Sequence, residues 1–433
     1  MDQGWLRRAL AVKRDGGEID TPTWTRIIDA YVDGTIDDAP VAALAMACTL
    51  RGMTDAEVVA LTEAMIRSGD VLEIRSRHTV VDKHSSGGVG DAISLIVVPL
   101  VAACGVPVAK LSGRALAHTG GTLDKLEAVP GVRTDLSPRA FVEQVERIGC
   151  AIAAQTERIA PADKKLYALR DRTGTVPSPG LIAASIVSKK IAGGAGAIVF
   201  DVKAGGGAFM HTRADALALA EALVRLTRGC GRRGSAVVTD MDEPLAANVG
   251  TGAEAVEARD FLRGDARDVR LGEIAAAIGQ EMLRVGGIAG DEVAARYDAA
   301  LASGAAYEKF LALLEAQGAA RATVERMSLV PERTTVRAAA GGYVTAIDAV
   351  AVGEAARIAV ESGGPFAGVR IIARNGTPVA RGAVLAEIAG APATHARVAA
   401  AFTIGDAPPP PRRLIESLLG DAAQPAASNA GVQ

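Results

Sequence analysis

Short apolar segments alternate with helical segments over the middle of this chain, and this alternation restricts its fold more than any other feature. The clearest strand-like segments are rich in valine, isoleucine and alanine. They cover residues 106–111, 151–154, 197–203 and 235–240. Strands that alternate with helices predict a largely parallel sheet with helices on its faces. We therefore expect a large α/β domain with a central, mostly parallel sheet.

The first 70 residues carry helical patterns only and predict a small all-helical domain. Asp20 or Thr21 can cap a helix with Pro22 in its first turn, and apolar side chains then recur at helical spacing until Gly34. A second helical stretch, from about residue 160 to residue 192, interrupts the α/β pattern and has a similar composition. We expect both stretches to form one helical domain, with the functional site in the cleft beside the α/β domain.

A polar, proline-marked stretch near residues 331–335 precedes a change of pattern to short β-like segments separated by glycines. It predicts a small C-terminal α+β domain. The expected division assigns residues 1–70 and about 160–192 to the helical domain, 71–159 and 193–330 to the α/β domain, 335–415 to the C-terminal domain, and 416–433 to a disordered tail.

Two expected strand-to-helix turns are rich in groups that bind anions. Residues 111–127 read LSGRALAHTGGTLDKLE, and residues 80–91 read VVDKHSSGGVGD. Backbone N–H groups at the glycines, the hydroxyls of Ser112, Thr119 and Thr122, and a helix N-terminus can converge on a phosphate-sized group. Each segment alone could be an ordinary turn, but a pair of them predicts one anion site at the carboxyl ends of neighbouring strands. Neither fits the P-loop or the dinucleotide fingerprint.

The composition argues against several other classes of protein. A net charge of −3 gives no general attraction to nucleic acid or to an anionic membrane. The four cysteines lie far apart, and no two of the five histidines have a metal-binding helical spacing, so we expect neither disulfides nor a transition metal. No apolar run approaches the ~20 residues of a membrane span, and the first residues lack a signal-peptide core. We expect a cytoplasmic protein without nucleic-acid or membrane partners.

Five sequence blocks resemble the thymidine and pyrimidine-nucleoside phosphorylase family in the same order. They read DKHSSGGVGD, SGRALAHTGGTLDKLE, LYALRD, ASIVSKK and DVKAGGGAFM, and the resemblance covers about residues 5–415. It implies a helical, an α/β and a C-terminal domain. It also implies a pentosyltransferase of pyrimidine nucleoside salvage or catabolism, which converts thymidine or deoxyuridine and phosphate reversibly to the free base and 2-deoxy-α-D-ribose 1-phosphate. A homodimer that requires no cofactor, with inorganic phosphate as co-substrate, is implied as well.

The resemblance also implies the site residues. Those that would bind phosphate are Lys83, Ser85, Ser94, Ser112 and Thr122. Those that would bind the pyrimidine and act in catalysis are His84, Arg170, Ser185 and Lys189, with Phe209 lining the base pocket. A monovalent cation is implied at Gly90, Leu245, Asn248 and Glu257, although the surrounding PLAANVGTGAEAVEA departs from the family's usual sequence.

These residue types suit the implied reaction. Phosphate attacks the anomeric carbon as the glycosidic bond breaks, so the sugar becomes cationic and the departing base becomes anionic. Fixed ammonium and hydroxyl groups hold the phosphate with little reorganisation. Arg170 and Lys189 can donate charge-assisted hydrogen bonds that strengthen as the base becomes negative. His84 can act as a general acid toward a base oxygen, and Ser185 can hold the ring nitrogen.

Structural alternatives exist for several of these residues. Lys83 and Lys189 could be solvated surface lysines, and His84 could be a structural histidine. Asp201 and Lys203, at the end of an apolar strand, suit either a role in the cleft or a structural ion pair. His118 could support its loop or touch the substrate, and Arg114 could brace the same turn.

Departures from the family's usual sequence leave the substrate range open. Residues 171–184 read DRTGTVPSPGLIAA, where the family has a more apolar segment, and Gly206 replaces a common serine. A broad pyrimidine-nucleoside phosphorylase that also accepts uridine is therefore the close alternative. A phosphoribosyltransferase of related architecture is more distant, because it needs acidic residues placed to hold magnesium and no convincing set is present. A binding protein without activity is least favoured, because every implied site residue is present.

Overall fold

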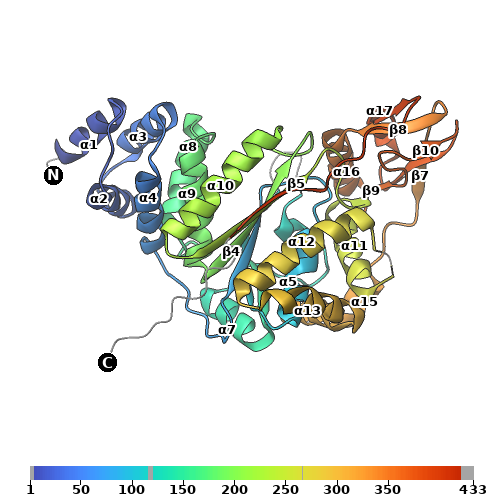
Figure 1. Cartoon of the computed structure of the whole chain (residues 1–433), viewed down its shortest axis with the longest axis horizontal. Coiled ribbons are helices and arrows are strands. Elements are labelled where there is room, and N and C mark those ends of the chain that lie inside the picture. The colour runs from blue at the N-terminus through green and yellow to red at the C-terminus, as the bar shows by residue number, and fades with distance from the viewer. Residues whose placement is uncertain (1–3, 116–119, 266, 421–433) are drawn as a thin grey trace.

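The computed structural model describes residues 4–115, 120–265 and 267–420 (Figure 1). A helical domain, an α/β domain and a C-terminal domain follow one another from left to right in this view. His118 and Thr119, which the sequence analysis placed in an anion-binding turn, lie outside the described residues. Within these ranges, no helix is long and apolar enough to cross a membrane.

The helical domain combines the first helices of the chain with a later pair. Its helices are α1 (Gly4–Arg14), α2 (Thr21–Val32), α3 (Asp38–Arg51), α4 (Asp55–Arg67), α8 (Pro161–Thr173) and α9 (Pro179–Ala192). Asp20 caps α2 by accepting a hydrogen bond from the backbone N–H of Thr23. Thr54 and Glu57 form a reciprocal capping box at the start of α4. Local sequence signals therefore set where these helices begin.

The central sheet has the strand order β13-β5-β4-β1-β2-β3, in which β13 is the late segment Ile415–Leu419. Its parallel strands are β1 (Val81–Ser85), β2 (Val108–Ser112), β3 (Cys150–Ala154), β4 (Ala197–Ala204) and β5 (Arg233–Asp240). The helices of the α/β part are α5 (Ile93–Ala103), α6 (Thr122–Glu127), α7 (Pro138–Ile148), α10 (Arg213–Gly229), α11 (Thr251–Arg263), α12 (Val269–Gly286), α13 (Gly290–Ala302) and α14 (Ala305–Ala316). The expected mostly parallel sheet is confirmed.

The two faces of the sheet belong to different hydrophobic cores, because successive side chains of a strand point to opposite faces. Val81, Val199 and Val237 pack into the core that contains α5 and α12. Ile198 and Phe200 pack into the core that contains α9 and α10 and continues into the helical domain. The helical domain therefore shares one core with a face of the sheet, and the parity of a residue along β1 or β4 decides which side of the sheet it serves.

The C-terminal part is built of small antiparallel sheets and helices. Its elements are β7 (Arg333–Arg337), β8 (Gly342–Ile347), α16 (Ala349–Gly363), β9 (Gly368–Ile371), β10 (Pro378–Val379), β11 (Val384–Ala389), η1 (Pro392–Thr394), α17 (His395–Ala400) and β12 (Phe402–Gly405). The preceding short helix α15 (Arg321–Arg326) still belongs to the α/β part, because its Val324 packs into that core. One sheet has the order β10-β8-β12 and another β6-β9-β11-β7. Strand β6 (Asn248–Val249) comes from the α/β region and pairs with β9. Backbone pairing therefore joins these two parts of the molecule.

The chain returns to the central sheet after the C-terminal part. Strand β13 (Ile415–Leu419) pairs antiparallel with β5, where Leu418 is level with Val237. Our assignment of residues 416–419 to a disordered tail was therefore wrong. The pairing covers the exposed edge of β5, whose backbone groups would otherwise face solvent. Residues 421–433 of that predicted tail lie outside the described residues.

Candidate active site

The carboxyl ends of β1, β2 and β4 meet at one edge of the sheet, since β1 pairs in parallel with both neighbours. Lys83 and Ser85 come from the end of β1, and Ser112 is the last residue of β2. Ser94 lies in the first turn of α5, and Thr122 is the first residue of α6. The fold thus brings the residues expected to bind phosphate to the same edge from four different elements.

Lys83 is a fully buried lysine, so the alternative of a solvated surface lysine does not hold for it. Its ammonium nitrogen lies 2.8 Å from a carboxylate oxygen of Asp201 and 3.9 Å from one of Asp91. Burial alone would lower the pKa of Lys83, but Asp201 and Asp91 raise it above its ordinary value. Lys83 therefore carries a positive charge at the phosphate edge.

Asp91 organises the turn between β1 and α5. One of its carboxylate oxygens accepts a hydrogen bond from the Ser85 hydroxyl at 2.6 Å, and the other accepts one from the backbone N–H of Ile93 at 3.2 Å. Burial raises the pKa of Asp91, but the ammonium groups of Lys203, Lys83 and Lys125 outweigh it and hold the pKa below its usual range. Asp91 was not assigned a role from sequence, although it ends the DKHSSGGVGD block.

The glycine turn before α6 is held by close backbone contact and by ion pairs. A Cβ atom at Gly121 would overlap the backbone of Arg114 and Ala115, so this position requires glycine. Arg114 donates to Glu127 at 2.6 Å and to Asp124 at 3.2 Å, and therefore braces the turn. Because α6 runs over Thr122–Glu127 alone, its dipole is short, and the hydroxyl and backbone groups are its main means of binding an anion.

The base half of the candidate site lies on the other side of the sheet, on α9. Ser185 and Lys189 are one helical turn apart, and the ammonium group of Lys189 donates to the Ser185 hydroxyl at 3.0 Å. The same ammonium group donates to a carboxylate oxygen of Asp163 on α8 at 2.7 Å. The Lys189 side chain is 27 % exposed, whereas that of Asp163 is buried. Sequence reasoning missed Asp163, which holds Lys189 in place.

Arg170 is placed differently from the other residues expected to bind the base. It is 1 % exposed, and its guanidinium group donates to the backbone carbonyls of Thr175, Val176 and Leu181. These carbonyls belong to the segment 171–184 that departs from the family's usual sequence. In this arrangement Arg170 holds the segment beside the base half, and its expected contact with a base remains a prediction.

His84 lies on β1 between Lys83 and Ser85 but on the opposite face of the strand. Its ring meets Phe200 of β4 edge to face, with the centroids 6.4 Å apart. Burial, followed by the charges of Lys190, Lys110, Lys189 and Lys83, lowers the pKa of His84 well below its ordinary value of 6.5. A neutral imidazole at pH 7 can donate one N–H to a ligand but does not carry a readily released second proton.

The glycine loop after β4 follows the same edge of the sheet. The backbone N–H of Gly205 donates to the carbonyl of Met210, which closes the loop. At Gly207, a Cβ atom would come within 2.6 Å of Ala349 in α16, so the loop lies against the C-terminal part. Phe209, the residue expected to line the base pocket, lies in this loop and is 37 % exposed.

The oxygens expected to hold a monovalent cation are committed to N–H donors. The Gly90 carbonyl accepts from the backbone of Ala92 and Ala246, and the Leu245 carbonyl accepts from Arg374 at 3.1 Å. Glu257 accepts from the backbone of Ala247 and from both the backbone and the side chain of Asn248. The buried Oδ1 atom of Asn248 has no partner among the described residues. A cation at this position would compete with these hydrogen bonds, and the expected cation site stays a prediction.

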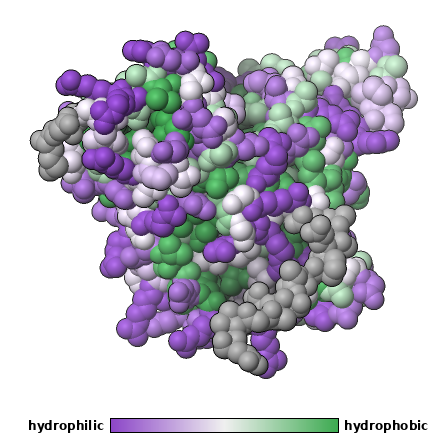
Figure 2. Space-filling view, turned by 60° about the vertical axis from the view of Figure 1, so that its left-hand side comes forward, coloured by the Kyte–Doolittle hydropathy of each residue, from purple (hydrophilic) through white to green (hydrophobic). Residues whose placement is uncertain are grey.

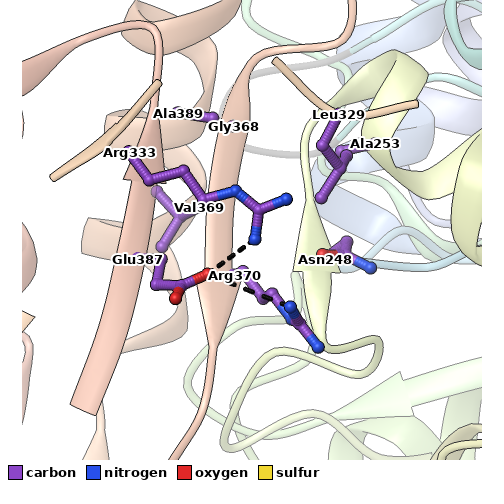
Figure 3. A pocket seen from close by; sticks show the side chains of 9 residues that line it. All are labelled: Asn248, Ala253, Leu329, Arg333, Gly368, Val369, Arg370, Glu387 and Ala389. Carbon is purple, nitrogen blue, oxygen red and sulfur yellow. Dashed lines mark hydrogen bonds and ion pairs between the residues drawn. The ribbon is translucent and has the colours of Figure 1, made fainter. Parts of the chain in front are cut away.

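A separate small pocket lies between helix α11 and the sheet β6-β9-β11-β7 (Figure 3). Arg333 and Arg370 point toward the carboxylate of Glu387, and the Arg333 guanidinium group donates to it at 2.7 Å. The volume of the pocket is about 10 Å³, which is room for a water molecule and not for a nucleoside. Its lining residues are Asn248, Ala253, Leu329, Arg333, Gly368, Val369, Arg370, Glu387 and Ala389.

Comparison with known families identifies the class of protein. Residues 7–69 match the helical bundle domain of the glycosyl transferase family, and residues 77–307 match the a/b domain of that family. The solved anthranilate phosphoribosyltransferase from Thermus thermophilus has a similar fold, with a TM-score of 0.56 at 23 % identity over 73 % of this chain and 99 % of that one. The chain therefore belongs to the glycosyl transferase family and has a fold similar to that of this transferase.

Curated relatives narrow this class. The chain is 44 % identical over 352 residues to a pyrimidine-nucleoside phosphorylase of Bacillus subtilis, covering 80 % of this chain and 81 % of the relative. It is 42 % identical over 436 residues to a thymidine phosphorylase of Sinorhizobium medicae, covering 95 % and 99 %. The chain therefore belongs to the pyrimidine-nucleoside and thymidine phosphorylase family.

Proposed function

We propose that the protein catalyses the reversible phosphorolysis of thymidine and deoxyuridine to the free pyrimidine base and 2-deoxy-α-D-ribose 1-phosphate. The observation that carries the proposal is the division of the strand DKHS by its two faces. Lys83 and Ser85 share a face of the sheet with the α5 core, and His84 shares the other face with α9, which carries Ser185 and Lys189. Hydrogen-bond donors for the phosphate and hydrogen-bond donors for the pyrimidine base thus lie on the two sides of the same strand ends.

In this mechanism, the phosphate lies between the Lys83 ammonium group, the hydroxyls of Ser85, Ser94 and Ser112, and Thr122. These groups position one phosphate oxygen to attack the anomeric carbon, and their fixed charges and dipoles limit the reorganisation needed during the attack. Burial of Lys83 strengthens its interaction with the anion, because the surrounding dielectric is low.

On the other side, the leaving base takes up negative charge as the glycosidic bond breaks. Lys189, oriented by Asp163, donates to the base, and this charge-assisted bond strengthens in the transition state. His84 donates its single N–H to a base oxygen as a neutral imidazole. Ser185 holds the ring nitrogen, and Arg170 acts on the base or fixes the segment 171–184 beside it. Together these groups stabilise the departing pyrimidine anion.

A broader pyrimidine-nucleoside phosphorylase is the second candidate, supported by the 44 % identity to the Bacillus subtilis protein of that name. The two candidates differ in whether the site accepts the 2′-hydroxyl of uridine. The altered segment 171–184, held by Arg170, is the part of the base half where this chain departs from the family's usual sequence.

A magnesium-dependent phosphoribosyl transfer is less favoured. The acidic run that begins with the last residue of β5 is neutralised by arginines: Arg270 pairs with Asp240 at 2.5 Å and with Glu243 at 3.4 Å, and Arg412 pairs with Asp242. Among the described residues, no group of three or more His, Cys, Asp or Glu side chains is arranged to hold a metal ion. These carboxylates are therefore poorly placed to bind a metal together with a diphosphorylated sugar.

The protein is also proposed to act as a homodimer joined through its helical domain. Apolar residues lie among hydrophilic ones on the face that Figure 2 turns forward. Val12 of α1 and Met46 and Leu50 of α3 are exposed apolar side chains of this domain, and Leu50 is 75 % exposed. Burial of such side chains against a second copy is favourable. Light scattering of the wild type and of a Leu50→Glu variant tests this contact.

The reaction is tested by incubating the purified protein with inorganic phosphate and thymidine, deoxyuridine or uridine, and measuring release of the free base. We expect release that depends on phosphate and is faster for the deoxynucleosides. Comparable rates with uridine would select the broader candidate. Release without phosphate, or no release from any pyrimidine nucleoside, would refute the proposed reaction. Activity that needs magnesium and a diphosphorylated ribose would support the transferase instead.

A further inference from the structure

Asp201 of β4 lies between two buried lysines. One of its carboxylate oxygens is 2.8 Å from the ammonium nitrogen of Lys83 on β1, and the other is 2.8 Å from that of Lys203, two residues further along β4. The Thr239 hydroxyl on β5 donates to the second oxygen at 2.9 Å. All four residues are fully buried. Asp201 and Lys203 therefore form the ion pair that the sequence allowed, and this ion pair extends to Lys83, which is expected to bind phosphate.

The register of the sheet explains why these side chains meet. Ser85 is level with Asp201, and Lys203 is level with Thr239, in neighbouring parallel strands. Lys83, Asp201, Lys203 and Thr239 therefore project from the same face as Val81 and Val199, toward α5. The row ends at the carboxyl edge, where the candidate phosphate residues gather.

The contacts have an unusual feature for buried ion pairs. Apart from their contacts with Asp201, the buried ammonium groups of Lys83 and Lys203 have no hydrogen-bond partner among the described residues, so each has N–H donors left over from its three. Buried donors without partners are costly and are normally satisfied. A phosphate at the neighbouring edge of the sheet would accept hydrogen bonds from these ammonium groups. The direction in which Lys83 and Lys203 point therefore affects phosphate binding.

We propose that Asp201 is a positioning residue for phosphate, which holds the ammonium groups of Lys83 and Lys203 side by side with their free donors available to the anion. This inference rests on the proposed function. Thr239 fixes the rotation of the Asp201 carboxylate, and Asp91, whose oxygen is 3.9 Å from the Lys83 nitrogen, supplies the second negative charge of the cluster. Asp201 does not itself contact phosphate, because like charges repel.

The test separates use of phosphate from use of nucleoside. In Asp201→Asn, the lysines lose their common counter-charge, and we expect KM for phosphate to rise about tenfold while KM for thymidine changes by less than about twofold. Thr239→Val removes the hydroxyl that orients the carboxylate, and we expect a smaller rise, of about threefold, in the same parameter. Thr239→Ser, which keeps the hydroxyl, should restore the wild-type value.

Thr227→Val is the matched control. Thr227 is also a buried threonine, and its hydroxyl donates to the Leu223 carbonyl within α10 at 2.7 Å, in the other core. A general loss of stability from removing a buried hydroxyl should appear in both valine variants, whereas the change in KM for phosphate should appear in Thr239→Val alone. An equal change in both would overturn the inference.

A measurement without nucleoside keeps this inference distinct from the proposed reaction. Inorganic phosphate should raise the Tm of the wild type, and the rise should be smaller in Asp201→Asn and Thr239→Val. Tighter phosphate binding in Asp201→Asn, or equal increases in KM for both substrates, would contradict a positioning role. If Asp201→Asn does not fold, an unchanged KM for phosphate in Thr239→Val decides against it. A wild type that binds phosphate but releases no base would refute the reaction alone.

Discussion

The ammonium group of Lys190, on helix α9, lies 2.8 Å from a carboxylate oxygen of Asp82 on strand β1, and both side chains are buried. Lys190 also donates to the Leu111 carbonyl near the end of β2. Each partner is the chain neighbour of a candidate site residue: Lys189 precedes Lys190, and Lys83 follows Asp82. One ion pair therefore joins the base half of the site to the phosphate half.

Lys190→Met should destabilise the protein, because it leaves Asp82 buried without its counter-charge. Breaking one partner of a buried ion pair costs about 3–5 kcal/mol. We expect a loss of this order in the free energy of unfolding, measured by urea denaturation, together with a lower kcat for thymidine phosphorolysis because the two halves are no longer joined.

The exposed pair Arg225–Asp55, with its atoms 3.5 Å apart, provides the control. Arg225→Ala should change the free energy of unfolding by less than about 1 kcal/mol. If both variants lose the same free energy of unfolding, the Lys190–Asp82 pair contributes no more to stability than an exposed ion pair does.

The stability of the protein should fall with acid in a way that depends on His84. Its pKa in the folded state is lowered well below 6.5 by burial and by the nearby lysines. Below pH 6.5 the unfolded chain therefore takes up a proton that the folded protein does not, and the free energy of unfolding falls by up to about 1.4 kcal/mol per pH unit until the folded pKa is reached.

This dependence is measured by comparing wild type with His84→Gln in urea denaturation between pH 5 and pH 7.5. The wild type should lose more stability than the variant as the pH falls through 6.5. Parallel curves for the two proteins would show that His84 titrates normally, and the description of it as a neutral donor would then be wrong.

Lys189→Met should lower kcat and kcat/KM for thymidine by a similar factor, of about a hundredfold, because its bond to the base strengthens in the transition state. Lys164→Met is the matched control, since Lys164 lies on the surface of α8 and pairs with Glu157. It should behave as the wild type. If Lys189→Met instead raises KM and leaves kcat unchanged, Lys189 binds the substrate and the transition state equally well.

Phosphorolysis should not depend on potassium. The oxygens of Gly90, Leu245 and Glu257 already accept N–H donors, so a cation would have to share these oxygens with the donors or displace them. Rates in potassium, sodium and tetramethylammonium salts of equal ionic strength should agree within about twofold. Saturable activation by potassium would show that these residues rearrange to bind it.

Much of the fold follows from local patterns that the sequence displays directly. The cap at Asp20 lies where its pattern predicts it, and strands β2, β3, β4 and β5 lie within about two residues of the predicted segments. The return strand β13 could not be predicted, because its short segment has no strong alternation and is stabilised by the free edge of β5. Nor could the role of Asp163, since its partner Lys189 is 26 residues away on another helix.

The candidate site divides in the same way. Lysine, histidine and serine in the strand DKHS are visible as residues that do not suit an apolar strand, and strand geometry alone places Lys83 and Ser85 opposite to Asp82 and His84. The commitment of Arg170 to the carbonyls of segment 171–184 is not visible in sequence, because it depends on how α8 and α9 turn toward each other.

By itself, the sequence determined the first helices, the main strands of the parallel sheet and the chemical types gathered in each block, because helix caps, strand patterns and glycine turns are local. Only the tertiary structure decided which charges meet. The Lys83–Asp201 pair depends on the register of the parallel strands β1 and β4, and the Lys190–Asp82 pair depends on how α9 packs against the sheet. Those are set by packing between segments that lie far apart in the chain, for which a local pattern carries no signal.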